Sequence, residues 1–502
     1  MILSYALLVF LTLLFFILTF RKSDLQKNLP PGPRKLPFIG NLHQIGELPY
    51  LSLQELSSHH GPLMFLKLGS VPTLVVSSAE IAKEIFKNHD LAFSGRPKLY
   101  AGNRLGYNGS AMTFTPYSDY WKEIKKIVML ELLSAKRVQS FQAVRFEEVQ
   151  VLLHSIALSC GSPVNLSHLT LSLTNNIVCR IAFGTRFGDA SSKFYEMLRE
   201  TQELLGGFCL ADFFPWLGWL NKFNGYESRL EKNFKELDNF YDKVIKEHAV
   251  NNDDSHQGLG VMEQHDDEDL VHVLLRLQKD SNQEIVLSDD QIKGVLTDIF
   301  IAGTDTAAAT MIWTMSELIR NPEKMERAQQ EVREVVLSKK KVMVEESDLP
   351  MLPYLKSVVK EALRIHPPAP LLVPRETIQP CTIKGYEIPA GTRVFINAKT
   401  IAMDPTCWEN PTEFSPERFL HSPIDFGGHH VEMLPFGAGR RGCPGVNFAM
   451  PLVELSLANL LFRFDWKLPD GVGREELDMQ EAIGITMHKK SPLCLIPSPS
   501  FA

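Results

Sequence analysis

The chain has 502 residues, of which 44% are hydrophobic and 22% charged, and its formal net charge is −7. This composition is typical of a globular protein, excludes a disordered or fibrous chain, and shows no basic surplus that would indicate a nucleic-acid partner. The seven cysteines stand at irregular spacings without a CxxC pair, which argues against a disulfide framework and favours a reducing compartment for the folded part.

The N-terminal residues 2–20, ILSYALLVFLTLLFFILTF, carry no charge. As a helix rising ~1.5 Å per residue, this stretch would span roughly 28 Å, close to the hydrocarbon thickness of a bilayer. A cleaved signal peptide is the alternative, but its apolar region is usually shorter and is followed by a small-residue cleavage site. We therefore predict a transmembrane anchor over residues 1–20. Basic residues between Arg21 and Lys35 place the remainder of the chain on the cytosolic side.

Residues 21–40 combine these charges with LPPGP, whose prolines fix the backbone and cannot continue a helix. We interpret them as a basic and proline-rich hinge that holds the following part at a set angle to the membrane. No repeat and no second linker follows, so residues 41–502 are expected to form one large globular domain.

Segments with helical periodicity dominate this domain, and strand-like stretches are few. Residues 63–69 and 73–78 predict a hairpin, and a second short β region is expected within 381–397. An acidic stretch at residues 266–269 is interpreted as a solvated loop. The expected fold class is therefore mainly α with a minor β region.

One long helix is predicted to begin after Ser288, which forms a capping-box pattern with Gln291, and to end at Arg320. About thirty residues correspond to roughly 45–50 Å, enough to cross a whole domain. The centre, AGTDT at residues 302–306, places a glycine, two threonines and Asp305 inside an apolar helix. It could be a tolerated kink with Asp305 in solvent, or a groove for a small ligand with a hydroxyl and a carboxylate for proton delivery.

Glu361 and Arg364 stand three residues apart in another helical segment, so they can pair on one face. Such a pair usually lies at the surface and contributes little to stability. Downstream, in FSPERF, Arg418 lies between apolar residues, where it could complete a buried network with the other two.

Cys443 lies in PFGAGRRGCPG, residues 435–445, where glycines and two arginines surround one thiol. Cationic neighbours favour the thiolate, which is the form that binds a metal or acts as a nucleophile. The glycines allow backbone N–H groups to approach the sulfur and a flat ligand. A nucleophile would need a basic partner and a zinc site would need more cysteine or histidine close by. Of the three options, a metal cofactor held by a single thiolate is favoured.

This stretch resembles the haem-binding signature of the cytochrome P450 family, Phe-x-x-Gly-x-Arg-x-Cys-x-Gly. The matching positions are Phe436, Gly439, Arg441, Cys443 and Gly445. AGTDT is similar to the family's oxygen-activation motif, Glu361 and Arg364 to its Glu-x-x-Arg pair, and PERF supplies the arginine that joins them, Arg418. The anchor and LPPGP are similar to microsomal members, and LPYLKSVVKEALRIHPPAPLLVPRE resembles the large plant group that oxidises specialised metabolites. The motifs follow the expected order over nearly the whole chain and imply the P450 fold.

The resemblance implies that Cys443 ligates the iron of haem b, with Asp305 and Thr306 delivering protons through water. Residues expected to contact haem or its propionates are Phe436, Gly439, Arg441, Gly445, Trp121, Lys125 and Arg375. Lys125 stands where the family usually has arginine, and lysine keeps the charge without the bidentate fork. Glu361, Arg364 and Arg418 would form a structural network.

The resemblance also implies a substrate pocket lined by Ala302, Leu371, Val373 and Ile485. The apolar segment FCLADFFPWLGWL, residues 208–220, is interpreted either as a substrate channel that dips toward the membrane or as core packing.

The implied reaction is monooxygenation, in which one atom of O2 enters a small apolar substrate with electrons from NADPH through NADPH-cytochrome P450 reductase. Lys122, Lys126 and Arg440 would form a basic face for the acidic reductase, or would be solvated side chains. The implied location is the endoplasmic reticulum membrane, single-pass, with the catalytic domain facing the cytosol. The alternative is a haem-thiolate isomerase or dehydratase independent of O2 and reductase; such relatives typically lose the threonine that is kept here as Thr306.

Overall fold

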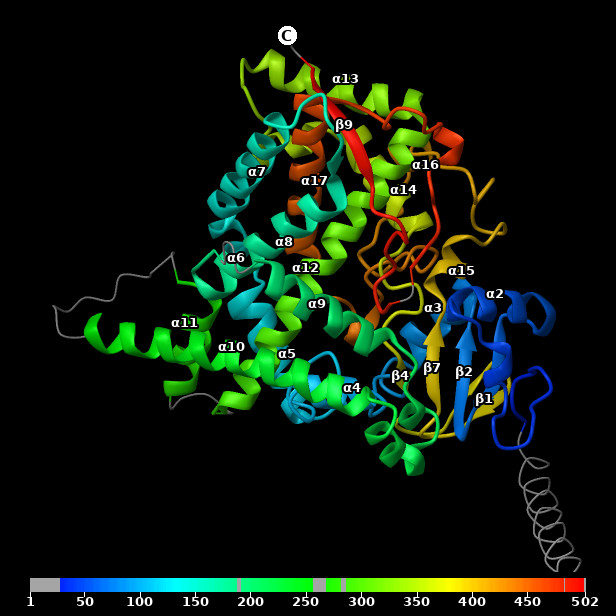
Figure 1. Ribbon diagram of the computed structural model, residues 1–502. Helices are drawn as coiled ribbons and strands as arrows, with labels where there is room; N and C mark the ends of the chain where they lie inside the picture. The colour runs from blue at the N-terminus through cyan, green and yellow to red at the C-terminus, as the bar shows by residue number, and fades with distance from the viewer. Residues whose placement is uncertain (1–27, 187–190, 256–267, 281–285, 483, 501–502) are drawn as a thin grey trace, which may run out of the picture.

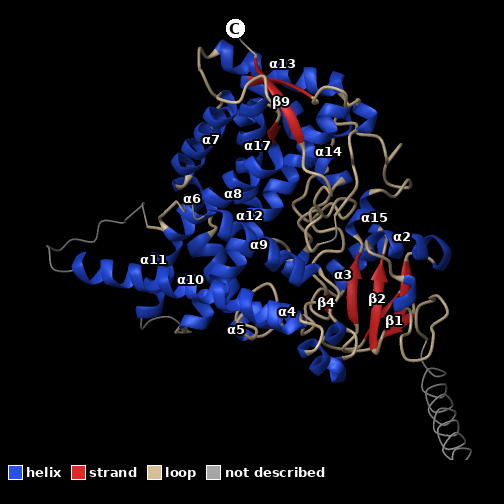
Figure 2. Ribbon diagram, viewed as in Figure 1, coloured by secondary structure: helices blue, strands red, loops and turns tan. Residues whose placement is uncertain are grey.

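The computed structural model describes residues 28–186, 191–255, 268–280, 286–482 and 484–500. Helices make up most of the molecule, and most strands gather at one side of it (Figure 1 and Figure 2). The prediction of a mainly α domain with a minor β region is confirmed. The predicted anchor at residues 1–20 and the first part of the hinge lie outside the described residues.

Helices run through the whole of the described chain, and short strands stand between them. The α-helices of the described residues are α2 (Pro49–His60), α3 (Ala79–Asn88), α4 (Tyr100–Leu105), α5 (Asp119–Ile127), α6 (Ala135–Ser140), α7 (Gln142–Ala157), α8 (Leu166–Phe183), α9 (Ser191–Gly206), α10 (Tyr226–Ser255), α11 (Leu270–Lys279), α12 (Asp289–Arg320), α13 (Pro322–Ser338), α14 (Pro353–Ile365), α15 (Ala398–Ala402), α16 (Glu417–Leu420) and α17 (Val446–Arg463). The strands are β1 (Leu63–Leu68), β2 (Val71–Val76), β3 (Val164–Asn165), β4 (Arg375–Glu376), β5 (Cys381–Ile383), β6 (Tyr386–Ile388), β7 (Arg393–Ile396), β8 (Phe464–Lys467) and β9 (Cys494–Pro499). Three short helices that bear on the site are η3 (Leu210–Asp212), η4 (Pro215–Lys222) and η6 (Gly439–Arg441).

The main sheet has the strand order β1-β2-β7-β4, and Figure 2 shows it beside the helical body. The strands β1 and β2 form the predicted hairpin, and β7 joins β2 in parallel register. The turn between β1 and β2 needs a glycine, because Gly69 has a φ of +63° and an added Cβ would lie 2.6 Å from the Phe213 carbonyl oxygen. This close approach holds the hairpin against η3. The strands β5, β6 and β7 confirm the predicted β region within 381–397.

The central helix α12 begins where the sequence predicts, since Ser288 and Gln291 form a reciprocal capping box. It packs against α8, α14 and α17 near the middle of the molecule (Figure 1). Among the described residues it is the one helix that is long and apolar enough to cross a membrane, but most of it is buried inside the protein. Its composition therefore reflects its place in the core.

The interpretation of residues 266–269 as a solvated loop is wrong for Asp269, while residues 266 and 267 lie outside the described part. Asp269 is buried and caps α11, because its Oδ1 accepts the backbone N–H of His272 at 2.9 Å. Its Oδ2 lies 2.8 Å from Nε2 of the buried His248 on α10. The carboxylate therefore joins two helices.

Candidate active site

The thiol of Cys443 lies in a tight loop between η6 and α17. The Cys443 N–H donates to the Phe436 carbonyl at 2.9 Å, which closes the loop, and the Gly445 N–H donates to Sγ at 3.3 Å. Gly439 has a φ of +70°, and an added Cβ there would lie 2.3 Å from Oδ1 of Asp90. Only glycine permits this backbone path, which turns the sulfur toward a cavity inside the molecule.

The sulfur is accessible from the cavity although it lies deep within the protein. In this surrounding, burial raises the pKa of the Cys443 thiol and the Gly445 N–H partly opposes the effect. Among the described residues, no histidine and no second cysteine lines the cavity. A zinc site and a cysteine–histidine nucleophile therefore lack their partners, and a metal held by one thiolate is the option that remains.

Arg96, Arg375 and Arg441 bring three guanidinium groups to the wall of the cavity. Burial, with the charges of Arg441 and Arg375, lowers the pKa of Arg96 well below its usual range. Burial lowers the pKa of Arg375 to about 10. Burial and then the charge of Arg375 lower the pKa of Arg441 to about 9. The carboxylates of the protein therefore do not fully neutralise these three guanidinium groups.

Arg375 is the clearest example of an incompletely neutralised arginine. Its Nη2 donates to the Ala438 carbonyl at 2.7 Å, but its buried Nη1 has no hydrogen-bond partner, and Oδ1 of Asp90 lies 3.6 Å away. A buried cation of this kind costs free energy unless a ligand supplies an anion. Haem would supply the missing binding partners, namely an iron for the thiolate and two propionates for the guanidinium groups. The residues present therefore fit this cofactor.

Trp121 and Lys125 lie on one face of α5 beside this cluster. The indole N–H of Trp121 donates to the Met112 carbonyl at 3.2 Å, and its ring lies 4.2 Å below the Arg441 guanidinium carbon. Lys125 lines the cavity, and its ammonium donates to the carbonyl of Arg440. Burial and the charge of Arg441 lower the pKa of Lys125. Both side chains thus support the loop and its arginines.

The α12 wall of the cavity includes Ala302, Gly303, Thr306, Ala307 and Thr310. The Thr306 hydroxyl donates to the Ala302 carbonyl at 2.7 Å, so its oxygen is left to accept a hydrogen bond from the cavity. Asp305 is buried and lies outside the lining, with Oδ2 2.8 Å from Nε2 of His488. The alternative in which Asp305 faces solvent is therefore wrong.

Of the four predicted pocket residues, Ala302 and Val373 line the cavity. Leu371 packs beside the hairpin instead, and its neighbour Leu372, with a φ of +54°, contributes to the lining. Ile485 is also outside the lining, and its backbone lies against Gly206. The backbone is irregular around Leu371 and Ile485, so the direction of these side chains does not follow from their positions in the sequence.

Two further residues of the lining escape sequence reasoning, namely Arg96 and Asp298. Arg96 donates to the carbonyls of Val373 and Pro374 at 2.7 and 2.8 Å. Asp298 on α12 accepts the Thr113 N–H at 3.3 Å, and burial raises its pKa to about 6. An arginine between glycine and proline, in SGRP, is a weak signal for Arg96; the periodicity of α12 gives none for Asp298.

Glu361, Arg364 and Arg418 meet away from the cavity. Arg364 donates from Nε and Nη2 to the two carboxylate oxygens of Glu361 at 2.7 and 2.9 Å, and both side chains are fully buried. Arg418 Nε donates to Glu361 Oε1 at 2.9 Å. The surface pair that was the alternative is therefore excluded, and the three residues tie α14 to α16.

Comparisons with known proteins agree with this site. A family model described as Cytochrome P450 matches residues 30–495. The chain is 68% identical over 504 residues to Cytochrome P450 71A9 of Glycine max, with 99% of each chain covered. It is 57% identical to strychnine-11-hydroxylase of Strychnos nux-vomica, with 94% of this chain and 92% of that protein covered. A solved structure of a zebra fish cytochrome P450 with abiraterone matches at a TM-score of 0.75 and 26% identity, covering 91% of this chain and 100% of that one.

These matches extend over almost the entire chain, and their family name agrees with a lone cysteine that faces a cavity lined by three arginines. The resemblance noted in the sequence is thereby confirmed. The chain belongs to the cytochrome P450 family, in its plant A-type group, and is a haem-thiolate monooxygenase.

Proposed function

We propose that the protein is a membrane-anchored monooxygenase of plant specialised metabolism. It takes electrons from NADPH through NADPH-cytochrome P450 reductase and places one oxygen atom in a small apolar substrate. The observation that carries the proposal is that the Cys443 sulfur and the Thr306 hydroxyl line one mainly apolar cavity together with three arginines.

Bound haem supplies the activation of dioxygen, and the chain supplies its surroundings. Cys443 would hold the iron, and the Gly445 N–H would withdraw charge from the sulfur. Arg96, Arg375 and Arg441 would neutralise the propionates. The Thr306 oxygen, whose own proton is donated to Ala302, can accept a hydrogen bond from a water molecule and so orient that water in the cavity.

An apolar substrate suits the part of the wall that α12 and the chain before β4 provide, including Val295, Ile299, Leu372 and Val373. The names of the relatives point to compounds of this class. One is called strychnine-11-hydroxylase, and another, 44% identical and from Prunus mume, is called phenylacetaldehyde oxime monooxygenase. Because these substrates differ in shape, the proposal extends to small, largely apolar specialised metabolites as a class.

Membrane association is supported by exposed apolar side chains near η4. Phe208, Trp216, Trp219 and the adjoining Phe223 are all more than half exposed, whereas Cys209, Ala211 and Phe214 are buried, so core packing accounts for only part of the segment 208–220. The segment also adjoins the proline-rich stretch: the Ser70 N–H donates to Phe213, and the neighbouring Gly69 N–H donates to Ile39. Aromatic residues at the surface are typical of a membrane interface, here that of the endoplasmic reticulum with the domain on its cytosolic side.

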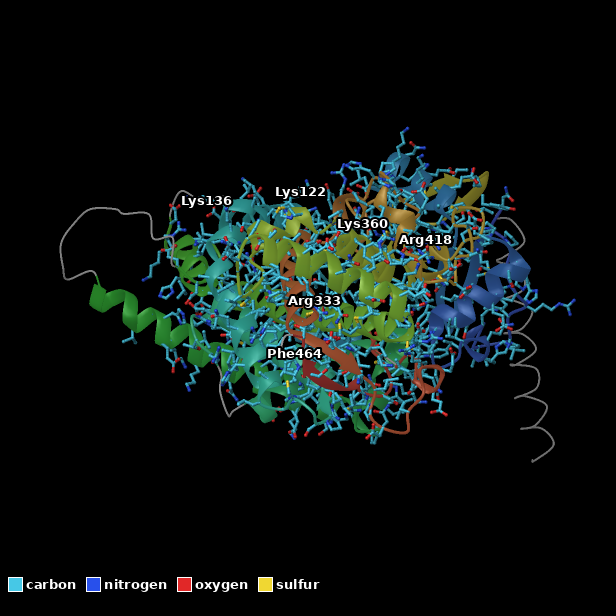
Figure 3. All side chains as sticks on the ribbon, turned by 90° about the horizontal axis from the view of Figure 1, so that it is seen from above. Lys122, Lys136, Arg333, Lys360, Arg418 and Phe464 are labelled. Atoms are coloured by element: carbon cyan, nitrogen blue, oxygen red, sulfur yellow. The ribbon has the colours of Figure 1, made fainter. Side chains whose placement is uncertain are left out.

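Docking of the reductase is supported by basic side chains on α5 and η6. Lys122, which is labelled in Figure 3, is exposed, and so are Lys126 on the same helix and Arg440. Lys122, Lys126 and Arg440 pair with neighbouring carboxylates. They are nevertheless positioned on α5 and η6, close to the Cys443 loop, where an electron donor of opposite charge would need to bind.

The test is turnover of a library of small apolar compounds by the full chain in microsomes with reductase. We expect product only with NADPH and dioxygen, and loss of both product and the carbon monoxide difference band of the thiolate-bound haem in Cys443→Ser. Conversion of a hydroperoxide without NADPH or reductase, and no NADPH-dependent product, would establish the isomerase or dehydratase alternative.

A further inference from the structure

Asp305 lies on the side of α12 that is turned away from the cavity. Thr306 lines the cavity, and one residue along a helix corresponds to a rotation of about 100°. The Asp305 carboxylate therefore meets the C-terminal part of the chain, where its Oδ2 lies 2.8 Å from Nε2 of His488. A carboxylate expected to deliver protons within the cavity is thus bound outside it.

His488 is the more accessible member of the pair. The Asp305 side chain is only 9% exposed, whereas that of His488 is 35% exposed. An imidazole can take up and release a proton near neutral pH, which a carboxylate in water or a threonine hydroxyl cannot. A proton path through these groups would therefore run from His488 to Asp305 and on to the cavity-facing Thr306.

The backbone around His488 is fixed to α12. Trp313, on the same helix as Asp305, donates its indole N–H to the Met487 carbonyl at 2.8 Å. The Met487 N–H donates to Pro368, and the His488 carbonyl accepts the Ala482 N–H, each at 2.8 Å. These bonds hold the imidazole at hydrogen-bond distance from the carboxylate.

The pair is electrostatically isolated. Burial alone lowers the pKa of His488, but the charge of Asp305 and their hydrogen bond oppose this effect, and the net direction is upward. Among the described residues, Asp305 is the charged group that faces the ring. The ammonium of the neighbouring Lys489 donates to the Asp478 carbonyl instead. Burial and this one carboxylate therefore act on the pKa of His488 in opposite directions, and the carboxylate prevails.

We propose that His488 is a positioning residue through which protons from solvent reach Asp305 and, from there, the cavity. In this step the Nε2–H bond of the imidazolium breaks as an Oδ2–H bond forms, leaving a neutral ring and a neutral carboxylic acid. The Asp305 side chain then turns toward Thr306 and gives its proton to a water molecule in the cavity. While Asp305 is turned away, Nε2 of the neutral ring is free and is protonated again from solvent. The Asp305 side chain, now a carboxylate, then rotates back to the imidazolium.

The inference rests on the proposed monooxygenase function, which consumes protons in the cavity, and predicts different behaviour for two replacements. In His488→Arg, a guanidinium can keep the ion pair but has no proton to release in this pH range. In His488→Gln, an amide can keep the hydrogen bond but carries neither charge nor a transferable proton. A merely structural role would be restored by arginine, whereas proton transfer would not.

The first measurement is product formed per NADPH consumed, from pH 6 to 8.5, in the full chain with reductase. We expect the wild type to show a pH-dependent yield, and both variants to show a yield about tenfold lower that hardly changes with pH. His59→Gln, which alters an exposed histidine of α2, is the matched control and should behave as the wild type. Thermal unfolding and the carbon monoxide band report whether each variant is folded and loaded.

The second measurement does not depend on turnover. Exchange of the imidazole C2 proton for deuterium, followed by mass spectrometry, gives the pKa of His488 in wild type and in Asp305→Asn. We expect this pKa to fall in Asp305→Asn and to coincide in wild type with the midpoint of the yield profile. This comparison does not require either His488 variant to fold.

The outcomes distinguish the proton path from the proposed function. Wild-type protein without NADPH-dependent product would contradict the proposed function itself. If wild type is active but His488→Arg has the wild-type yield and pH profile, or if the pKa of His488 is the same in Asp305→Asn, the proton path through His488 is wrong while the monooxygenase function stands.

Discussion

Among the described residues, the arginines around Glu361 and those at the cavity differ in their partners. Around Glu361, the guanidinium groups of Arg364 and Arg418 each donate to a carboxylate oxygen within 2.9 Å, and the Ser415 N–H also donates to that carboxylate. Arg364 further donates to the Ala402 carbonyl at 2.8 Å. Charge and hydrogen bonds are both satisfied within the chain, as in a buried network that holds elements together.

At the cavity, the guanidinium groups of Arg96, Arg375 and Arg441 donate mainly to backbone carbonyls. Burial lowers the pKa values of all three arginines, because carbonyls satisfy hydrogen bonds but do not neutralise charge, and Asp90 opposes the effect at Arg375 only in part. A buried cation that is paired closely within the chain serves the fold, whereas one whose charge is incompletely neutralised indicates the place of a ligand. The following predictions test that distinction.

The largest effect is expected for Glu361→Gln. It leaves two guanidinium groups without their carboxylate in a buried site, which should cost about 3–5 kcal/mol of the free energy of unfolding. The measurement is thermal or denaturant unfolding of the haem-loaded protein. Glu123→Gln, at the surface pair of Glu123 and Lys126 with the same three-residue spacing, is the matched control and should cost less than about 1 kcal/mol. Equal losses in the two variants would contradict the assignment of Glu361 to the fold.

A smaller effect, with opposite signs in two states, is expected for Arg375→Gln. The replacement removes a charge that would bind a propionate, so haem affinity should fall by about 10–100-fold. The haem-free protein should be as stable as wild type or slightly more stable, because the repulsion with Arg96 and Arg441 decreases. Haem titration and unfolding of the haem-free form measure the two terms. Destabilisation of the haem-free form as severe as that of Glu361→Gln would make Arg375 structural and remove the contrast between the clusters.

The sequence predicts the cluster around Glu361 better than the arginine cluster at the cavity, for a physical reason. Glu361 and Arg364 lie one turn apart, and the capping box of α12 spans three residues, so local spacing determines both. Arg96 meets Val373 over 277 residues, and His488 meets Asp305 over 183, so periodicity carries no information on either contact. Local patterns thus predict the elements and the Cys443 loop, while long-range contacts determine which side chains reach the cavity.

The same limit applies within single segments. The sequence places Leu371 in the pocket, but Leu372 takes the left-handed backbone conformation and lines the cavity in its place. Sequence pattern also places Asp305 with Thr306 in one motif without stating that their side chains point to different sides of α12. One residue of displacement in a helix or loop is enough to change the surroundings of a side chain completely.

A pH dependence should distinguish the haem-free from the loaded protein. Folding lowers the pKa of Arg375 to about 10 and that of Arg441 to about 9, below their values in the unfolded chain. Above these values the unfolded state binds more protons than the folded state, so the free energy of unfolding should rise with pH between about 9 and 11 from this source. Bound propionates should restore the charged forms and abolish the rise. The measurement is the difference between the unfolding midpoints of the two forms across this range; a constant difference would show that the propionates do not meet these arginines.

The smallest effect concerns a second histidine–carboxylate pair, His248 and Asp269, which lies between α10 and α11 and away from the cavity lining. Although burial opposes it, Asp269 raises the pKa of His248, and His248 and the His272 N–H lower that of Asp269. A raised histidine pKa contributes stability that is complete below about 6.5, the value in the unfolded chain, and is lost as pH rises through the higher folded value. His248→Gln should therefore cost about 1–3 kcal/mol near pH 6 and less near pH 8, while product per NADPH and its pH profile stay as in wild type. Because the His488 variants are expected to change that profile, unfolding and yield measured side by side would show whether two similar pairs differ in function; a changed yield in His248→Gln would mean that they do not.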